Sequence, residues 1–298
     1  TVALDSTHQE NPTTNEYTIS IEKKAQTKFI NGKYSDAFTI ITGNTNKPTN
    51  PKYEEVAKLF PQEDNEIEIK NILDNLPKPK GNIKIFEKHV AENMTGLKNG
   101  KGCGPSGMSA ELLRQLWKQS ESIRTKITEL VNLFINRPFE IDDNFFLSNL
   151  HCIPKQPTGI RPIAVEELFT KLVNKIVCQQ LMAQTYSKIH QNQYCIREMD
   201  SQMEAVNNVK QNIKEGYTKV IAVDFKNAYG MIHREHIIKQ LKDMEVHPIL
   251  IKYVHHLLQK QQMIFVDDEG KLRTINPTRG IAQGDPTSSL LFCIGVND

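Results

Sequence analysis

Apolar side chains recur along much of this chain with the period of an α-helix. Residues 121–135 are the clearest case: from Ile123 the apolar positions fall at i, i+4, i+7, i+8 and i+11, which is one face of a helix. Similar patterns predict further helices, with Ser109 as a candidate N-cap and Gly216 as a helix stop. The other predicted helices cover residues 16–43, 52–60, 85–100, 108–119, 166–186, 199–216, 231–244 and 247–260.

Shorter apolar runs predict β-strands. Residues 149–155 and 159–165 flank the tripeptide Gln-Pro-Thr, which predicts a hairpin. Residues 263–266 (MIFV) and 272–275 (LRTI) predict two strands, and Asp-Asp-Glu-Gly-Lys between them predicts the turn of a second hairpin. Residues 218–225 (TKVIAVDF) are almost continuously apolar, which predicts a strand buried on both faces.

Composition changes along the chain indicate its organisation. Residues 1–16 are polar and are predicted to be disordered. Residues 17–82 are predicted to be a helical extension, whose last part, residues 61–82, is acidic, then Pro-rich, and is predicted to be a linker. The first residue is Thr, and the charged and apolar regions of a signal peptide are missing, so we expect a fragment without its native start.

The overall composition excludes some classes of protein. Apolar residues make up 38% of the chain, and no run approaches the roughly 18 apolar residues of a membrane span. The five cysteines are scattered without a Cys-x-x-Cys pair, which predicts reduced thiols, no zinc site and a nuclear or cytoplasmic protein that is not secreted. The net charge is +2, so nucleic-acid binding requires local clusters of Lys and Arg.

Three segments carry candidate chemistry. A buried strand that ends in Asp224 places a carboxylate where desolvation is costly, so a divalent metal is one partner and a helix cap is the alternative. Lys155 and Arg161 bracket the first hairpin tip, which suits gripping a triphosphate, although an ordinary solvated hairpin has the same pattern. Residues 280–292 (GIAQGDPTSSLLF) predict a tight turn that a base could approach, or a simple loop before a buried helix.

Taken in order, these segments resemble reverse transcriptases of non-long-terminal-repeat (LINE-type) retrotransposons, over about residues 20–298. The order is a Gly-Pro-x-Gly turn, the fingers hairpin, a Gln-Tyr-x-x-Arg segment and two palm motifs. The QGDP form of the second palm motif is most similar to site-specific elements with a restriction-like endonuclease, and residues 30–43 with 58–63 are similar to their helical extension. The matching positions are residues 98–113, Arg161, Pro162, Ile163, Gln193, Tyr194, Arg197, Asp224, Ala228, Tyr229, Ile232, His233, Gln283, Gly284, Pro286, Ser288, Leu291 and Phe292.

The resemblance implies a fold and an activity. The fold is α+β, a right-hand polymerase with a helical extension, fingers at residues 83–217 and a partial palm at residues 218–298. The activity is that of an RNA-directed DNA polymerase, which copies an RNA template from a DNA primer or target. It uses dNTPs and two Mg²⁺ ions, for which Mn²⁺ is a possible substitute, and no membrane is involved.

The resemblance also implies roles for single residues. Asp224 would bridge the two ions, and the carbonyl of Phe225 would bind one of them. Tyr229 would lie under the nucleotide sugar, where its ring clashes with a 2′-hydroxyl and favours a DNA product. The remaining implied contacts are Gln283 and Gly284 beside the incoming base, Lys155 and Arg161 on its phosphates, and Lys98, Lys101, Arg114 and Arg197 on nucleic acid.

Five positions depart from the family pattern. Ser106 stands where Asp is usual, and Cys195 and Ile196 replace Gly-Phe. Gly230 stands where an acid is common, and Ser289 replaces a Pro. None of these changes removes a catalytic atom, but together they indicate divergence or decay.

The sequence FVDD (265–268) looks like the second aspartate pair of a polymerase but lies before the QG turn, whereas the family's pair lies after it. We therefore predict that its acids belong to a hairpin turn and that the true pair lies beyond Asp298. The 298 residues alone are then predicted not to polymerise.

Other functions stay open. A domesticated or decayed copy would bind RNA without catalysis. A group II intron maturase or a retron polymerase usually has Pro-Gln-Gly-Gly in the second palm motif, which residues 281–286 (IAQGDP) do not have. A helical scaffold would require five chance matches in the right order.

Overall fold

The computed structural model describes Lys23, Gln26, Thr27 and residues 49–63, 65–155, 159–196 and 201–297. The chain divides into residues 1–48 and residues 49–298. In the first unit, the three described residues are helical, and the Thr27 hydroxyl donates to the carbonyl of Lys23 (2.9 Å). The predicted disorder of residues 1–16 and most of the predicted helix at 16–43 lie outside the described residues.

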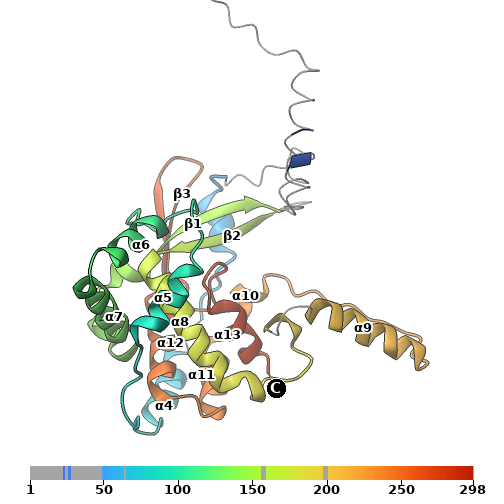
Figure 1. The fold of residues 1–298 in the computed structure, drawn as a ribbon. Helices are drawn as coiled ribbons and strands as arrows, with labels where there is room; N and C mark the ends of the chain where they lie inside the picture. The colour runs from blue at the N-terminus through green and yellow to red at the C-terminus, as the bar shows by residue number, and fades with distance from the viewer. Residues whose placement is uncertain are drawn as a thin grey trace, which may run out of the picture. The chain divides into compact units, whose positions relative to one another are not determined.

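The second unit combines α-helices with one β-sheet, as the predicted α+β class requires (Figure 1). Most predicted helices are present, and the Ser109 hydroxyl caps its helix by accepting from Leu112 N (3.2 Å). The helices are α3 (Tyr53–Ala57), α4 (Glu66–Asp74), α5 (Glu87–Thr95), α6 (Ala110–Gln119), α7 (Glu121–Asn136), α8 (Leu168–Thr185), α9 (Ser201–Lys214), α10 (Ala228–Met231), α11 (Arg234–Asp243), α12 (Pro248–Lys260) and α13 (Ser288–Gly295).

The sheet joins two hairpins that are far apart in sequence. Its order is β2-β1-β3-β4, with β1 (Leu147–Pro154), β2 (Ile160–Glu166), β3 (Gln262–Val266) and β4 (Leu272–Ile275). Both predicted hairpins are confirmed, since β1 is antiparallel to β2 and β3 is antiparallel to β4. The two hairpins are linked by parallel pairing of β1 with β3.

Helix α8 lies at the centre of the helical packing. It contacts α5, α7 and α13, and its side chains Leu172, Val173, Val177 and Leu181 are fully buried. A helix that is apolar over most of its surface belongs in a core, which is where α8 is found. Among the described residues, no helix combines the length and the apolar character that crossing a bilayer requires.

The predicted linker at residues 61–82 is wrong for residues 66–74, which form α4. Its Ile69 is buried, and Ile72 and Leu73 pack against the main core. The acidic residues that suggested a linker include Glu66 and Glu68, which lie in the first turn, where negative charge favours a helix.

The predicted buried strand at residues 218–225 is also wrong. These residues form no helix or strand, and their side chains are exposed, with Ile221 at 86% and Val223 at 73%. An apolar run forms a strand only where another strand accepts its backbone hydrogen bonds. Within the described residues the four strands of the sheet pair only with one another, so this run has no partner.

Candidate nucleic-acid and nucleotide site

The Gly-rich turn at residues 102–107 is held against the junction of β2 and α8. A Cβ on Gly104 would lie 2.7 Å from backbone atoms of Glu166 and Glu167, so only glycine fits there. Ser106 donates its backbone N–H (2.6 Å) and its hydroxyl (2.5 Å) to the two carboxylate oxygens of Glu167, which is buried. The turn is therefore fastened to the start of α8.

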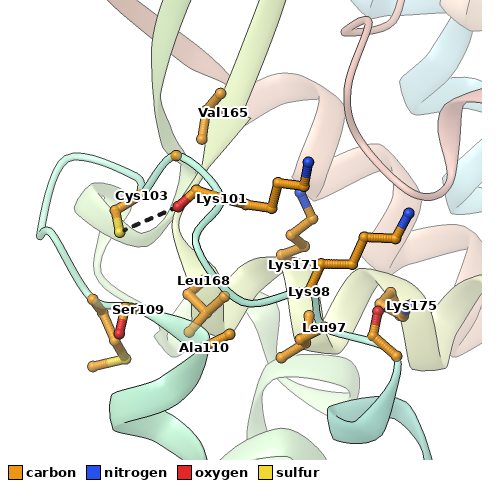
Figure 2. A pocket seen from close by; sticks show the side chains of 13 residues that line it. Leu97, Lys98, Lys101, Cys103, Ser109, Ala110, Val165, Leu168, Lys171 and Lys175 are labelled. Atoms are coloured by element: carbon orange, nitrogen blue, oxygen red, sulfur yellow. Dashed lines mark hydrogen bonds between the residues drawn. The ribbon is translucent and has the colours of Figure 1, made fainter. Parts of the chain in front are cut away.

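Beside this turn lies a pocket of about 410 Å³ with four lysines around it. Lys98 and Lys101 come from the loop between α5 and this turn, and Lys171 and Lys175 come from successive turns of α8 (Figure 2). The described residues that line the pocket include no carboxylate. Four like charges in a lining without carboxylates make this pocket attractive to an anion.

The sequence indicated two of these four lysines. Lys171 and Lys175 lie within the segment that resembles the fingers, but no role was predicted for them, and their only separate signal is a lysine pair at i and i+4 of a helix. Contact between α5 and α8 brings them to the residues that follow α5.

Arg114 has a different role from the one that the resemblance implied. Its guanidinium donates to the carbonyls of Met94 (3.2 Å) and Leu97 (2.8 Å) and to the side chain of Asn99. Through these bonds the guanidinium holds the loop that carries Lys98. The contact of Arg114 with nucleic acid stays a prediction. Arg197 lies outside the described residues.

The QG turn, which contains Gln283 and Gly284, packs directly on the hairpin formed by β1 and β2. The backbone N–H of Ala164 on β2 donates to the carbonyl of Gln283 (2.8 Å). Gly284 has φ +122°, and a Cβ there would collide with the carbonyl of Ala164. Arg161 lies on the same strand, three residues before Ala164, so one strand carries both a predicted phosphate contact and the support of the QG turn.

The hairpin tip is closed beside Lys155, whose backbone N–H donates to the carbonyl of Gly159 (2.9 Å). Lys155 and Arg161 are both exposed. Their contact with nucleotide phosphates stays a prediction.

The two predicted palm motifs meet around Tyr229. Its hydroxyl lies 3.0 Å from the Ser289 hydroxyl, and its ring lies 5.2 Å from that of Phe292 on α13. Its carbonyl accepts from the backbone N–H of Ile281 (2.9 Å). Ser289, one of the departures from the family pattern, therefore supplies a hydrogen bond that proline could not make.

Packing also explains why glycine, and not an acid, stands at position 230. Gly230 is buried, and a Cβ on it would lie 2.6 Å from the carbonyl of Leu59. An acidic side chain at this position would not fit without moving the chain at Leu59. The departure is therefore matched by the neighbouring backbone.

Asp224 and Phe225 lie on the exposed segment before Tyr229. Asp224 forms no hydrogen bond or ion pair with any other described residue, and Phe225 is 72% exposed. A carboxylate and a carbonyl are oxygen donors of the kind that Mg²⁺ binds. Over the described part of the chain, however, no group of three or more His, Cys, Asp or Glu residues could hold a metal.

The buried aspartate of FVDD, Asp267, stabilises the hairpin turn. Asp267 is 1% exposed, and its Oδ1 accepts from the backbone N–H groups of Glu269 (3.0 Å) and Lys271 (2.8 Å). Its Oδ2 accepts from Nε of Arg273 (2.6 Å). The predicted turn between β3 and β4 is confirmed, and this carboxylate is already fully engaged in protein bonds.

The geometry defines an α+β unit in which a cationic pocket, a β-hairpin and a Gly-rich turn lie close together along β2 and α8. Residues 153–298 match the family model described as reverse transcriptase (RNA-dependent DNA polymerase). The chain therefore contains a reverse transcriptase domain over these residues, and RNA-directed DNA polymerase is the general activity of that family. The match begins near the end of β1 and includes β2, Tyr229 and the QG turn.

Proposed function

We propose that this chain is the fingers and partial palm of a non-long-terminal-repeat retrotransposon reverse transcriptase, of the site-specific type with a restriction-like endonuclease. It binds an RNA template and a DNA primer and works with dNTPs and Mg²⁺ in the nucleus or cytoplasm. The reverse transcriptase match supports the general activity, and the ordered motifs from residue 98 onward support the finer assignment.

The observation that carries this proposal is the four-lysine pocket. Lys98, Lys101 and Lys171 form no ion pair with other described residues, so their charges are available to a ligand. Phosphodiester groups of a single strand would neutralise these charges and release counterions. We place the RNA template here, next to the Gly-rich turn, with the primer and nucleotide toward Tyr229 and the QG turn.

The test is RNA binding measured against salt concentration. We expect Lys171→Gln with Lys175→Gln to weaken binding of a single-stranded RNA by about tenfold at 0.1 M salt. The slope of log K against log[salt] should fall by about 1.4, because about 0.7 is lost for each phosphate contact on a single strand.

A matched control exists on α9, where Lys210 and Lys214 have the same spacing and are exposed. Lys210→Gln with Lys214→Gln should change binding by less than about twofold. If both double variants have the same effect, or if the salt slope does not change, the pocket is not the template site.

We also propose that the 298 residues do not polymerise alone. Two-metal transfer needs carboxylates on both ions, and in the described residues Asp224 has no second carboxylate in a metal-binding group. Primer extension on an RNA template with Mg²⁺ and dNTPs should yield no product. Extension by this chain, especially extension that is lost in Asp267→Ala, would refute the proposal.

The exposed and unclustered Asp224 favours a second function, RNA binding without catalysis. The two functions are separated in an open reading frame that contains these residues together with any that follow. Extension that Asp224→Ala abolishes identifies the enzyme, while RNA binding without extension identifies the non-catalytic protein.

A further inference from the structure

Behind the QG turn, the buried carboxyl group of Glu166 and the half-buried carboxyl group of Asp285 share one amide. Asn174 on α8 donates from Nδ2 to Oε2 of Glu166 (2.7 Å) and to Oδ2 of Asp285 (3.0 Å). Glu166 is the last residue of β2, and Asp285 follows Gly284 in the QG turn. The amide therefore connects the fingers hairpin to the turn.

The orientation of this amide is set from a third element. Tyr253 on α12 is fully buried and donates its hydroxyl to Oδ1 of Asn174 (2.6 Å). Since Oδ1 is occupied by that bond, Nδ2 must face the two carboxyl groups, and each of its hydrogens has one acceptor. A flipped amide would point Oδ1 at both carboxyl groups and would lose its bond to any carboxylate that is charged.

Asp285 connects Asn174 to the end of the QG turn. Its Oδ1 accepts from the backbone N–H (2.6 Å) and the hydroxyl (2.7 Å) of Thr287, just before α13. On the other side of the turn, Gln283 is held by Ala164 on β2. Both ends of the turn are thus tied to the same strand, directly at Ala164 and through Asn174 at Glu166.

The surroundings of Glu166 favour a neutral acid. Its Oε1 is buried without a partner, and so is Oε1 of Gln261; both residues line a cavity of about 10 Å³. A proton on Glu166 turns one of these two acceptors into a donor. Burial, and next the negative charge of Asp285, raise the pKa of Glu166 well above its ordinary value.

The other charged and titratable groups around Glu166 do not reverse this preference. Asp285 faces it from the turn, Tyr253 from α12 and Lys171 from α8, while Cys178 on α8 interacts with Asp285. Burial raises the pKa of Asp285 too, so the two acids resist being charged together. Lys171 is the cation that acts in the opposite direction, since its positive charge lowers the pKa of both carboxyl groups.

We propose that Glu166 is a positioning residue for the QG turn, which it holds through Asn174 and Asp285 as an uncharged acid. Ionisation of Glu166 places two negative charges on one amide and loosens the turn. That this turn lies beside a nucleotide rests on the proposed function, whereas the geometry of the network does not.

The test is the protection of the Ala164 and Thr287 amides against hydrogen exchange from pH 5.5 to 8.5. We expect protection, after correction for intrinsic rates, to fall with rising pH by up to about tenfold per pH unit once Glu166 ionises. Glu166→Gln keeps the shape and stays neutral, so its protection should not change with pH. The matched control Glu204→Gln, on the exposed face of α9, should behave as the original protein does.

The amides of Ile237 and Leu241 in buried α11 report on global unfolding and should stay protected in every sample. Protection of Ala164 and Thr287 that is independent of pH in the original protein would overturn the proposal. So would a Glu166→Gln variant that still loses protection as pH rises. RNA binding on the same samples tests the template pocket separately, and its loss would leave this result standing.

Discussion

Single residues that depart from the family pattern have physical partners in this structure. Ser106 donates two hydrogen bonds to buried Glu167, Gly230 lies against the Leu59 carbonyl, and Ser289 lies within hydrogen-bond distance of Tyr229. Matched partners of this kind are expected when a sequence diverges while its fold is maintained.

We predict that Ser106→Asp destabilises the protein by about 2 kcal/mol, because it places a second carboxylate against buried Glu167. Adding Glu167→Gln should restore most of the loss. Ser109→Asp is the control, because Asp is as good an N-cap as Ser. Urea denaturation measures all four proteins, and equal stability of Ser106→Asp and Ser109→Asp would contradict the prediction.

The two aspartates of FVDD are predicted to contribute differently to the stability of the protein. Asp267→Ala removes the acceptors of three bonds in the hairpin turn, and we expect the melting temperature to fall by about 4 °C or more. The exposed neighbour Asp268→Ala should change it by less than about 1 °C. Calorimetry gives the comparison, and a normal melting temperature for Asp267→Ala would show that the turn does not depend on this carboxylate.

At the scale of elements, the local sequence pattern predicted the structure correctly where a segment makes its backbone hydrogen bonds within itself or with an adjacent strand. Helices α7 and α8 and both hairpins form where periodicity and turn residues predicted them, because their hydrogen bonds are made within the element or between adjacent strands. Residues 218–225 have equally strong strand residues but lack a partner among the described strands.

This difference predicts a contrast between two isoleucines. Ile221 is 86% exposed, so Ile221→Ala should change the free energy of unfolding by less than about 0.5 kcal/mol. Ile237 on α11 is fully buried, so Ile237→Ala should lower it by about 2–5 kcal/mol. A similar loss in both variants would mean that residues 218–225 are buried after all.

At the scale of the whole unit, α8 connects the described sites. Its apolar side chains fill the core, Lys171 and Lys175 face the pocket, and Asn174 holds Glu166 and Asp285. Lys171 also acts electrostatically on Glu166 and Asp285, so charge in the pocket and protonation behind the QG turn are neighbouring events.

The buried acids predict how stability depends on pH. The pKa of Glu166 is raised in the folded protein, so the folded state binds more protons, and its stabilising contribution is lost as pH rises through the folded pKa. We therefore expect the free energy of unfolding of Glu166→Gln, minus that of the original protein, to increase from pH 5 to pH 8. The slope for one proton is at most about 1.4 kcal/mol per pH unit.

Burial lowers the pKa of His255 and of His256, which has the opposite effect on stability, since that contribution is lost as pH falls. Both histidines are present in both proteins, so their contribution cancels in the difference. Denaturation at a series of pH values gives this difference, and a value that does not change with pH would contradict the prediction.

The sequence by itself determined most of the helices, the two hairpins, the resemblance to reverse transcriptases and the interpretation of FVDD as a turn. These features depend on residues close together in the chain, whose hydrogen bonds and periodicity are local. Tertiary structure alone decided that residues 66–74 form a helix that packs on the core through Ile69, and that residues 218–225 are exposed. It also placed Lys171 and Lys175 beside Lys98 and Lys101, and it joined Glu166, Asn174 and Asp285. The reason is that burial, charge clusters and strand pairing depend on which distant segments meet, and no local pattern encodes that.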